Sequence, residues 1–316
     1  MLEGKRIGVV IPAHNEEKLI GRVIDTIPGF VDRIIVVDDR SSDGTRGVVE
    51  KYREHDKERV LLVPLEQNQG VGGAIVAGYK RAIEESLDVV AVMAGDAQMD
   101  PDDLFRVVNP VVRGEADYVK GNRLFRGESW KMIPHYRYLG NSVLSLLTKI
   151  ASGYWHLADS QSGYTAISLI ALRRLNLDAI YKRYGMPNDI LIKLNINNFR
   201  VRDVSVRPVY NIGEKSGIRL WRVVPTISLL LFKGFFRRLF EKYVIRDFHP
   251  LVFFYLMGIL LTPPGIVLGV YLVLVRIMGT PVAATSALFS AFLIISGFQS
   301  LFFAMLFDME YNKHLK

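Results

Sequence analysis

Three short polar clusters carry the acidic and amide side chains of this sequence that could do chemistry. They occupy residues 12–16 (PAHNE), 38–44 (DDRSSDG) and 95–101 (GDAQMDP). Carboxylate and amide oxygens are the ligands that Mg²⁺ and Mn²⁺ prefer. Each cluster alone has a structural explanation, because Asn15 or Asp43 could simply cap the helix that follows it. If the clusters meet, however, their carboxylates would repel one another unless a cation or a ligand lay among them.

Each of these clusters follows a short apolar run that is typical of a buried strand. Apolar runs predict strands at 7–12, 33–39, 60–64 and 88–94, and helical spacing predicts helices at 16–27, 44–54 and 73–85. Strands that alternate with helices of this length are typical of βαβ units and a mostly parallel sheet. Because ligands bind at the carboxyl ends of the strands in such sheets, we expect the three clusters at one edge.

A glycine-rich stretch at 70–73 follows the third predicted strand and opens a helix. It is no dinucleotide-binding fingerprint, because Ile75 stands at the third glycine position and no acidic residue closes the next strand at the usual distance. We predict instead that residues 68–74, which include Asn68 and Gly70, form a loop that closely approaches a bound donor.

The C-terminal part of the chain is nearly free of charge. Residues 251–275 and 282–307 are 25 and 26 residues long and contain no charged side chain. Since about 20 helical residues cross the hydrocarbon core of a bilayer, each segment is long enough to span a membrane. The basic residues that flank this pair of segments outnumber the lone Arg276 between them, which predicts that both termini are cytoplasmic.

The net charge of +8 could indicate a nucleic-acid partner or a membrane surface. Residues 219–250 hold seven Lys and Arg against two acidic residues, directly before the apolar segments. This location favours anionic lipid headgroups, so no nucleic-acid partner is expected. Within it, residues 220–240 are apolar but interrupted by charges, which favours a helix in the headgroup plane. A core helix of the soluble domain stays an alternative.

The sequence contains no cysteine, which excludes disulfides, thiol catalysis and cysteine-ligated metal sites. The whole pattern predicts an α/β domain over residues 1–218, basic interfacial helices over 219–247 and a transmembrane helical hairpin over 248–316. We therefore expect a multi-pass protein of the cell membrane whose soluble domain faces the cytoplasm. The sequence leaves the oligomeric state open.

Five motifs, in this order, resemble the family 2 glycosyltransferases of the GT-A fold. They are VVIPAHNEE at 9–17, IVVDDRSSD at 35–43, DAQMDP at 96–101, KGNR at 120–123 and DSQSGY at 159–164. The likeness covers residues 6–218 and is greatest to the dolichyl- and polyprenyl-phosphate sugar synthases. It implies inverting transfer of a hexose, from a donor of the GDP-mannose or UDP-glucose type, to a polyprenyl or dolichyl phosphate at the cytoplasmic face.

The resemblance also implies which residues bind the nucleotide-sugar and the acceptor. Those expected at the nucleotide-sugar are Pro12, Ala13, His14, Asn15, Glu16, Asp38, Asp39, Asn68, Gly70 and Asp96. Arg123, Arg137 and Asn141 would bind the acceptor phosphate, to which the forked donors of a guanidinium are suited.

A divalent cation, Mg²⁺ or Mn²⁺, is implied in the same way, with Asp96 and Gln98 as its protein ligands. The family usually shows two aspartates that flank one residue before this glutamine. Here Ala94 stands at the first of these positions, so weaker metal binding is expected.

The role expected for Asp159 depends on the acceptor. If the acceptor is a hydroxyl of a glycolipid or polysaccharide, Asp159 would be the general base, because an alcohol is a poor nucleophile at neutral pH. If the acceptor is a lipid phosphate, which is already ionised, Asp159 could orient Arg123 or Arg137 or bind the sugar. A membrane-anchored nucleotide-sugar sensor and a nucleotidyltransferase are the remaining alternatives.

Overall fold

The computed structural model describes residues 1–123, 135–207, 209 and 220–316, with side chains omitted for 135–141 and 220–223. Among these residues the chain divides into two compact units. The first comprises residues 1–235 together with 315–316, and the second comprises residues 236–314. The predicted boundaries at 218 and 247 stay predictions.

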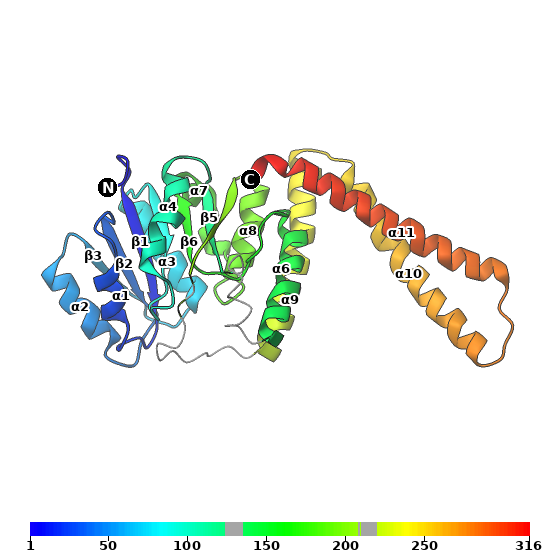
Figure 1. The fold of residues 1–316 in the computed structure, drawn as a ribbon, viewed down its shortest axis with the longest axis horizontal. Helices are drawn as coiled ribbons and strands as arrows, with labels where there is room; N and C mark the ends of the chain where they lie inside the picture. Colours follow the sequence, from blue (N-terminus) through cyan, green and yellow to red (C-terminus); the bar gives the residue numbers. More distant parts are fainter. Residues whose placement is uncertain (124–134, 208, 210–219) are drawn as a thin grey trace. The chain divides into compact units, whose positions relative to one another are not determined.

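A seven-stranded sheet forms the centre of the first unit, in the order β3-β2-β1-β4-β6-β5-β7 (Figure 1). The strands are β1 (Ile7–Ala13), β2 (Arg33–Asp38), β3 (Val60–Pro64), β4 (Val89–Val92), β5 (Tyr118–Asn122), β6 (Thr165–Ser168) and β7 (Val201–Ser205). β6 runs antiparallel to β4 and β5, whereas the other pairs are parallel. The mostly parallel sheet expected from the sequence is confirmed.

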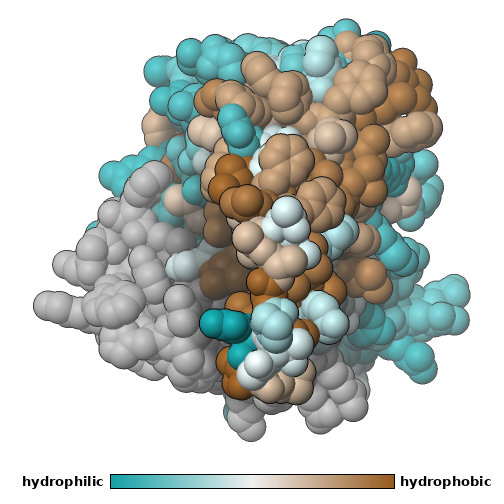
Figure 2. All heavy atoms as spheres, turned by 90° about the vertical axis from the view of Figure 1, so that its right-hand side faces the viewer, coloured by the Kyte–Doolittle hydropathy of each residue, from teal (hydrophilic) through white to brown (hydrophobic). Residues whose placement is uncertain are grey.

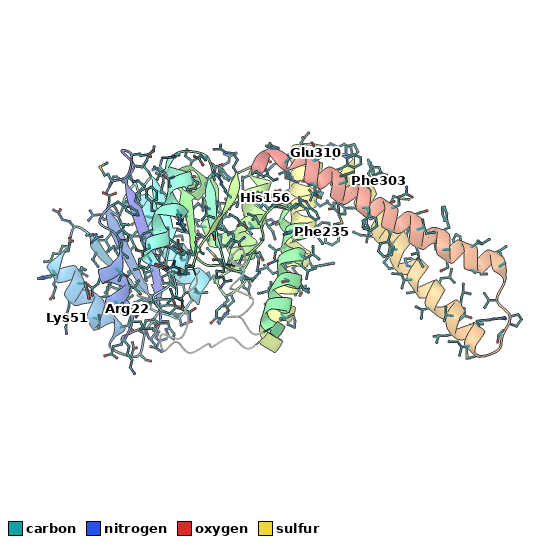
Figure 3. The ribbon with its side chains drawn as sticks, viewed as in Figure 1. Arg22, Lys51, His156, Phe235, Phe303 and Glu310 are labelled. Atoms are coloured by element: carbon teal, nitrogen blue, oxygen red, sulfur yellow. The ribbon has the colours of Figure 1, made fainter. Side chains whose placement is uncertain are left out.

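Helices cover both faces of this sheet. One core packs α1 (Ile20–Thr26), α2 (Thr45–His55) and α4 (Leu104–Val112) against the sheet. The other core holds α3 (Val71–Glu84), α7 (Leu169–Arg174) and α8 (Met186–Ile196), and α6 (His135–Ser152) joins a smaller cluster with α8. Successive residues of β2 alternate between these cores, as strand geometry requires: Ile34 and Val36 face one, Ile35 and Val37 the other. Outward positions such as Arg22 and Lys51 stay exposed (Figure 3).

The strands and helices predicted before residue 94 are all present, and one of them starts more than two residues from its predicted position. The first helix begins at Ile20 and not at Glu16. The Glu16 carbonyl accepts the N–H groups of Leu19 and Ile20, while the Glu16 N–H donates to the Thr45 hydroxyl at 2.8 Å. This contact draws residues 14–17 toward the loop after β2, so they form a turn before the helix.

Two long apolar helices dominate the second unit. They are α10 (Leu251–Ile277) and α11 (Ala284–Tyr311), and both are candidate membrane spans by length and composition. Small residues line their contact, where the Ser290 hydroxyl donates to the Gly265 carbonyl at 3.0 Å. Apolar side chains cover the outside (Figure 2): Val267 and Phe302 are 69 % and 65 % exposed, as suits a lipid-facing surface.

The chain reaches this hairpin through α9 (Leu220–Phe240) and a π-helical segment, η3 (Glu241–Arg246). Two basic residues counted in the surplus before the hairpin are buried here: Arg238 is 0 % and Lys242 1 % exposed. The Lys242 amine donates to the Asn312 side-chain carbonyl at 2.8 Å. The sequence-based expectation that both face lipid headgroups is therefore wrong for these two residues.

Candidate active site

The three polar clusters meet at the carboxyl edge of the central strands, as expected. In the register of β1 and β2, Ala13 lies opposite Asp38. On the other side of β1, the Gly95 N–H donates to the Pro12 carbonyl at 3.3 Å. The clusters after β1, β2 and β4 are thus neighbours because their strands are neighbours.

A hydrogen-bonded corner joins the first two clusters to the loop after β3. His14 Nδ1 lies 2.9 Å from the Asp39 carbonyl oxygen, and the Asn68 amide donates to the same oxygen at 3.2 Å. If His14 donates here, its proton lies on Nδ1 and Nε2 is left as an acceptor. The side chains of His14 and Asn68 and the backbone of Asp39, from three separate loops, form one wall of the site.

The Asp39 carboxylate organises the glycine loop. The side chain is 4 % exposed, and its two oxygens accept the N–H groups of Gln69 and Gly70 at 2.7 and 2.9 Å. Gly70 has φ +79°, and a Cβ there would lie 2.9 Å from the Lys182 carbonyl oxygen. Glycine is therefore required by conformation and by space. The approach of this loop to a bound donor stays a prediction, and the sequence did not indicate that Asp39 holds the loop.

Asn15 links the loops after β1 and β2. Its backbone has φ 59°, which asparagine tolerates better than most residues. Its side-chain oxygen accepts the Ser42 N–H at 2.8 Å, and the Asp38 carboxylate accepts the Ser41 N–H at 3.2 Å. Both predicted site residues thus shape the loop after β2.

Several acidic side chains lie near Glu16 at this edge of the sheet. Burial, and then the charges of Asp96 and Asp43, raise the pKa of Glu16. Asp96 closes a turn in which its carboxylate accepts the Gln98 N–H at 3.1 Å. A cation would relieve this repulsion, so the donor set fits a divalent metal in charge and chemistry. Yet the described residues contain no group of three His, Asp or Glu side chains placed to share one ion.

Arg123 and Asp159 form the second centre of the site. The guanidinium Nε and Nη2 donate to the two carboxylate oxygens of Asp159 at 2.8 and 3.2 Å. The Asp159 side chain is 2 % exposed and the Arg123 side chain is 30 % exposed, so the arginine stays partly accessible to solvent. Burial alone would raise the pKa of Asp159, but the charge and hydrogen bonds of Arg123 outweigh it and hold this pKa below its usual range. Such a carboxylate orients a guanidinium well and is a weak base.

The two centres lie on the same edge of the sheet. β4 and β5 both run antiparallel to β6, so Asp96 and Arg123 follow strands that end on the same side. The Tyr164 hydroxyl donates to the Asp100 carbonyl at 3.0 Å and ties the segment after Asp159 to the cluster after β4. Arg137 and Asn141 belong to α6, but their side chains lie outside the described residues.

Comparison with known proteins agrees with this arrangement. A family model described as glycosyl transferase family 2 matches residues 8–175. The chain is 34 % identical over 250 residues to the UDP-N-acetylglucosamine--dolichyl-phosphate N-acetylglucosaminyltransferase of Methanococcus voltae, which covers 75 % of this chain and 96 % of that protein. It is 32 % identical over 206 residues to the undecaprenyl-phosphate mannosyltransferase of Micrococcus luteus, which covers 64 % and 82 %.

A solved structure supports the fold assignment. Glucosyl-3-phosphoglycerate synthase from Mycobacterium tuberculosis, in complex with Mn²⁺, uridine diphosphate and glucosyl-3-phosphoglycerate, superposes with a TM-score of 0.51. The match covers 74 % of this chain and 80 % of that chain at 24 % identity, so it bears on the fold alone. The matched family model agrees with the sequence motifs and with the strand ends that meet at one edge of the sheet. This chain therefore belongs to the family 2 glycosyltransferases, with a GT-A catalytic unit.

Proposed function

We propose that this enzyme transfers a sugar from a nucleotide-sugar donor to the phosphate of a polyprenyl or dolichyl carrier, at the cytoplasmic face of a membrane. The observation that carries the proposal is the Arg123–Asp159 pair. It offers an oriented guanidinium, which suits a phosphate, and it makes Asp159 a weak base, because Arg123 lowers the pKa of that carboxyl. The two relatives, which by name act on dolichyl and undecaprenyl phosphate, support the same acceptor class.

The reaction would be a single displacement with inversion. A phosphate oxygen of the carrier attacks the anomeric carbon, and the bond from that carbon to the nucleotide diphosphate breaks. By analogy with phosphoserine, the second ionisation of the carrier phosphate lies near pH 6, so no protein base has to remove a proton. Arg123 would hold the nucleophile in line with the anomeric carbon.

The donor side would be built by the first two clusters and the glycine loop. His14, Asp39 and Asn68 would line the nucleotide, and the Asp39-bound loop would pack beside it. Asp96 and Gln98 would hold a divalent cation, which stabilises the negative charge on the departing diphosphate when it is bound. The Methanococcus voltae relative makes UDP-N-acetylglucosamine the first donor to test, before UDP-glucose and GDP-mannose.

The membrane orientation rests on both ends of the hairpin. α10 ends at Ile277 and α11 begins at Ala284, so two spans joined by this short connection would have their outer ends on the same side of a membrane. The surplus of basic residues before the hairpin then favours the cytoplasmic side.

The test is a transfer assay with the purified full chain in detergent or nanodiscs. Short polyprenyl phosphate and the matching polyprenol are offered as acceptors, with UDP-N-acetylglucosamine, UDP-glucose and GDP-mannose as donors. We expect product with the phosphate and none with the alcohol. Preferential transfer to the alcohol would overturn the proposal and favour the hydroxyl-acceptor alternative, in which Asp159 is the base.

A further inference from the structure

Lys120 is a buried cation that interacts electrostatically with both Arg123 and Asp159, and it has no role in the proposed transfer step. Its side chain, on β5, is completely buried, and its amine donates to the Ser162 carbonyl at 2.7 Å. Ser162 follows Asp159 by three residues. The lysine therefore holds the C-terminal end of the segment that carries Asp159.

Asp203 holds the other end of the same segment. It lies on β7 directly opposite Lys120 in the parallel register of β5 and β7. One carboxylate oxygen of Asp203 accepts the Ala158 N–H at 2.7 Å and the Asn122 amide at 2.9 Å. Within the described part of the chain, its other oxygen accepts no hydrogen bond. Segment 158–162 is thus tied to two neighbouring strands, once before Asp159 and once after it.

These side chains form a balanced group of charges. Lys120 and Arg123 are positive, and Asp159 and Asp203 are negative; they come from β5, the residue after it, segment 158–162 and β7. Burial lowers the pKa of Lys120 to about 8, although both carboxylates act to raise it, and Arg123 lowers it further. Burial likewise raises the pKa of Asp203. The charge on Lys120 is therefore the member of the group that mild alkali can remove.

We propose that Lys120 and Asp203 are positioning residues for the acceptor phosphate, because they fix segment 158–162 at both ends and so set the direction in which Asp159 holds Arg123. This inference rests on the proposed function. When Lys120 loses its charge, two carboxylates face a single guanidinium. Arg123 is then drawn toward them and binds a phosphate less well. The donor wall at His14, Asp39 and Asn68 is not involved.

The wild-type enzyme supplies a first test that needs no variant. The KM for short polyprenyl phosphate and the KM for the donor are measured between pH 7 and pH 9.5, where the acceptor phosphate stays dianionic. We expect the acceptor KM to rise above about pH 8 while the donor KM stays level. An acceptor KM without such a rise contradicts the inference.

Lys120→Met supplies the second test, with Lys193→Met as its matched control. Lys193 is also buried and pairs with a carboxylate, Asp189, but it donates to the Ala179 carbonyl, away from segment 158–162. In Lys120→Met we expect an acceptor KM about tenfold higher at pH 7, from the lost charge-assisted contact, with the alkaline rise abolished. Lys193→Met should keep the alkaline rise. A parallel increase of both KM values in Lys120→Met, or an alkaline rise that persists in it, would refute the positioning role.

Asp203→Asn supplies a third test, which keeps the inference testable if Lys120→Met does not fold. The asparagine keeps an oxygen for the Ala158 N–H but removes one negative charge, so we expect the alkaline rise of the acceptor KM to become smaller. An unchanged alkaline rise in a folded Asp203→Asn enzyme contradicts the inference. A wild-type enzyme that does not use polyprenyl phosphate at all overturns the proposed function and this inference together. An active wild type with a level acceptor KM overturns this inference alone.

Discussion

Arg238 and Asp308, seventy residues apart in sequence, form a two-pronged ion pair in which both side chains are completely buried. The two N–O distances are 2.8 and 3.0 Å, and the Tyr243 hydroxyl donates to the same carboxylate at 2.5 Å. Asn312 adds a hydrogen bond to the Tyr243 hydroxyl at 2.7 Å. The pair therefore joins the end of α9 to the end of α11 through a polar network inside the second unit.

We predict that Asp308→Ala destabilises the second unit by about 3–5 kcal/mol, because it leaves the Arg238 guanidinium buried without its counter-ion. The measurement is thermal unfolding in detergent or nanodiscs. Lys313→Ala is the control, since its pair with Glu310 is about 70 % exposed on both sides and should contribute little. The double change Arg238→Met with Asp308→Leu should recover much of the loss. A mild effect of Asp308→Ala alone would show that the pair does not hold these helices together.

Asp39→Asn should weaken donor binding while the fold persists. An amide offers one acceptor atom where the carboxylate offers two, so either the Gln69 or the Gly70 N–H loses its partner. Since an unpaired buried group costs about 1–3 kcal/mol, we expect a tenfold to hundredfold weaker nucleotide affinity by calorimetry. Asp25→Asn, which changes an exposed carboxylate on α1, is the control. Normal nucleotide affinity in Asp39→Asn would contradict the assigned role of this loop.

Asp96→Asn should lower turnover by orders of magnitude in Mg²⁺ or Mn²⁺ and leave the melting temperature near that of the wild type. The reverse experiment adds the missing carboxylate: Ala94→Asp should tighten the apparent metal affinity. Position 94 lies two residues before Asp96, between the end of β4 and the turn at Asp96, so a carboxylate there would add a second acidic ligand close to the first. Metal titrations of activity decide both cases. Near-normal turnover of Asp96→Asn would remove Asp96 from the metal site.

Arg123→Lys should impair acceptor use nearly as much as Arg123→Ala, because an ammonium cannot reproduce the forked contact with a phosphate. A charge-assisted bond contributes about 1.5–3 kcal/mol, so a tenfold to hundredfold loss in kcat/KM for polyprenyl phosphate is expected. The donor KM should change little. A lysine enzyme with full acceptor efficiency would mean that the phosphate is held elsewhere.

Asp159→Asn should keep part of the rate and leave the acid side of the pH–rate profile in place, because no proton passes to Asp159. Its effect on stability has a definite sign. The folded pKa of Asp159 lies below the usual value of 3.8, so its stabilising effect is complete above about pH 4 and disappears as the pH falls through the folded pKa. Acid unfolding below pH 4 should therefore differ between wild type and variant, while their stabilities change in parallel between pH 5 and 7. An inactive Asp159→Asn enzyme would restore the general-base interpretation.

Local patterns in the sequence were enough to predict the mostly parallel sheet and the apolar hairpin. Continuous apolar runs located the strands up to β4, apolar residues with a period of 3.6 located the helices between them, and two long charge-free segments located α10 and α11. The three polar clusters after β1, β2 and β4 could be assigned to one edge, because parallel strands must end together. These features depend on neighbours in sequence, which is why they can be read without coordinates.

The partners of individual charges depended on contacts between distant residues, and only the tertiary structure decided them. The Asp39 carboxylate accepts the backbone N–H groups of Gln69 and Gly70, partners that lie 30 and 31 residues away in the sequence. Arg238 belongs by sequence to a basic stretch that suits lipid headgroups, yet Asp308 pairs with it in a buried network. Lys120 and Asp203 stand 83 positions apart and gain their common role only because β5 and β7 are adjacent. The charge of a side chain follows from its residue type. The group that pairs with this charge depends on which elements pack together, because burial and distance set the strength of each electrostatic interaction.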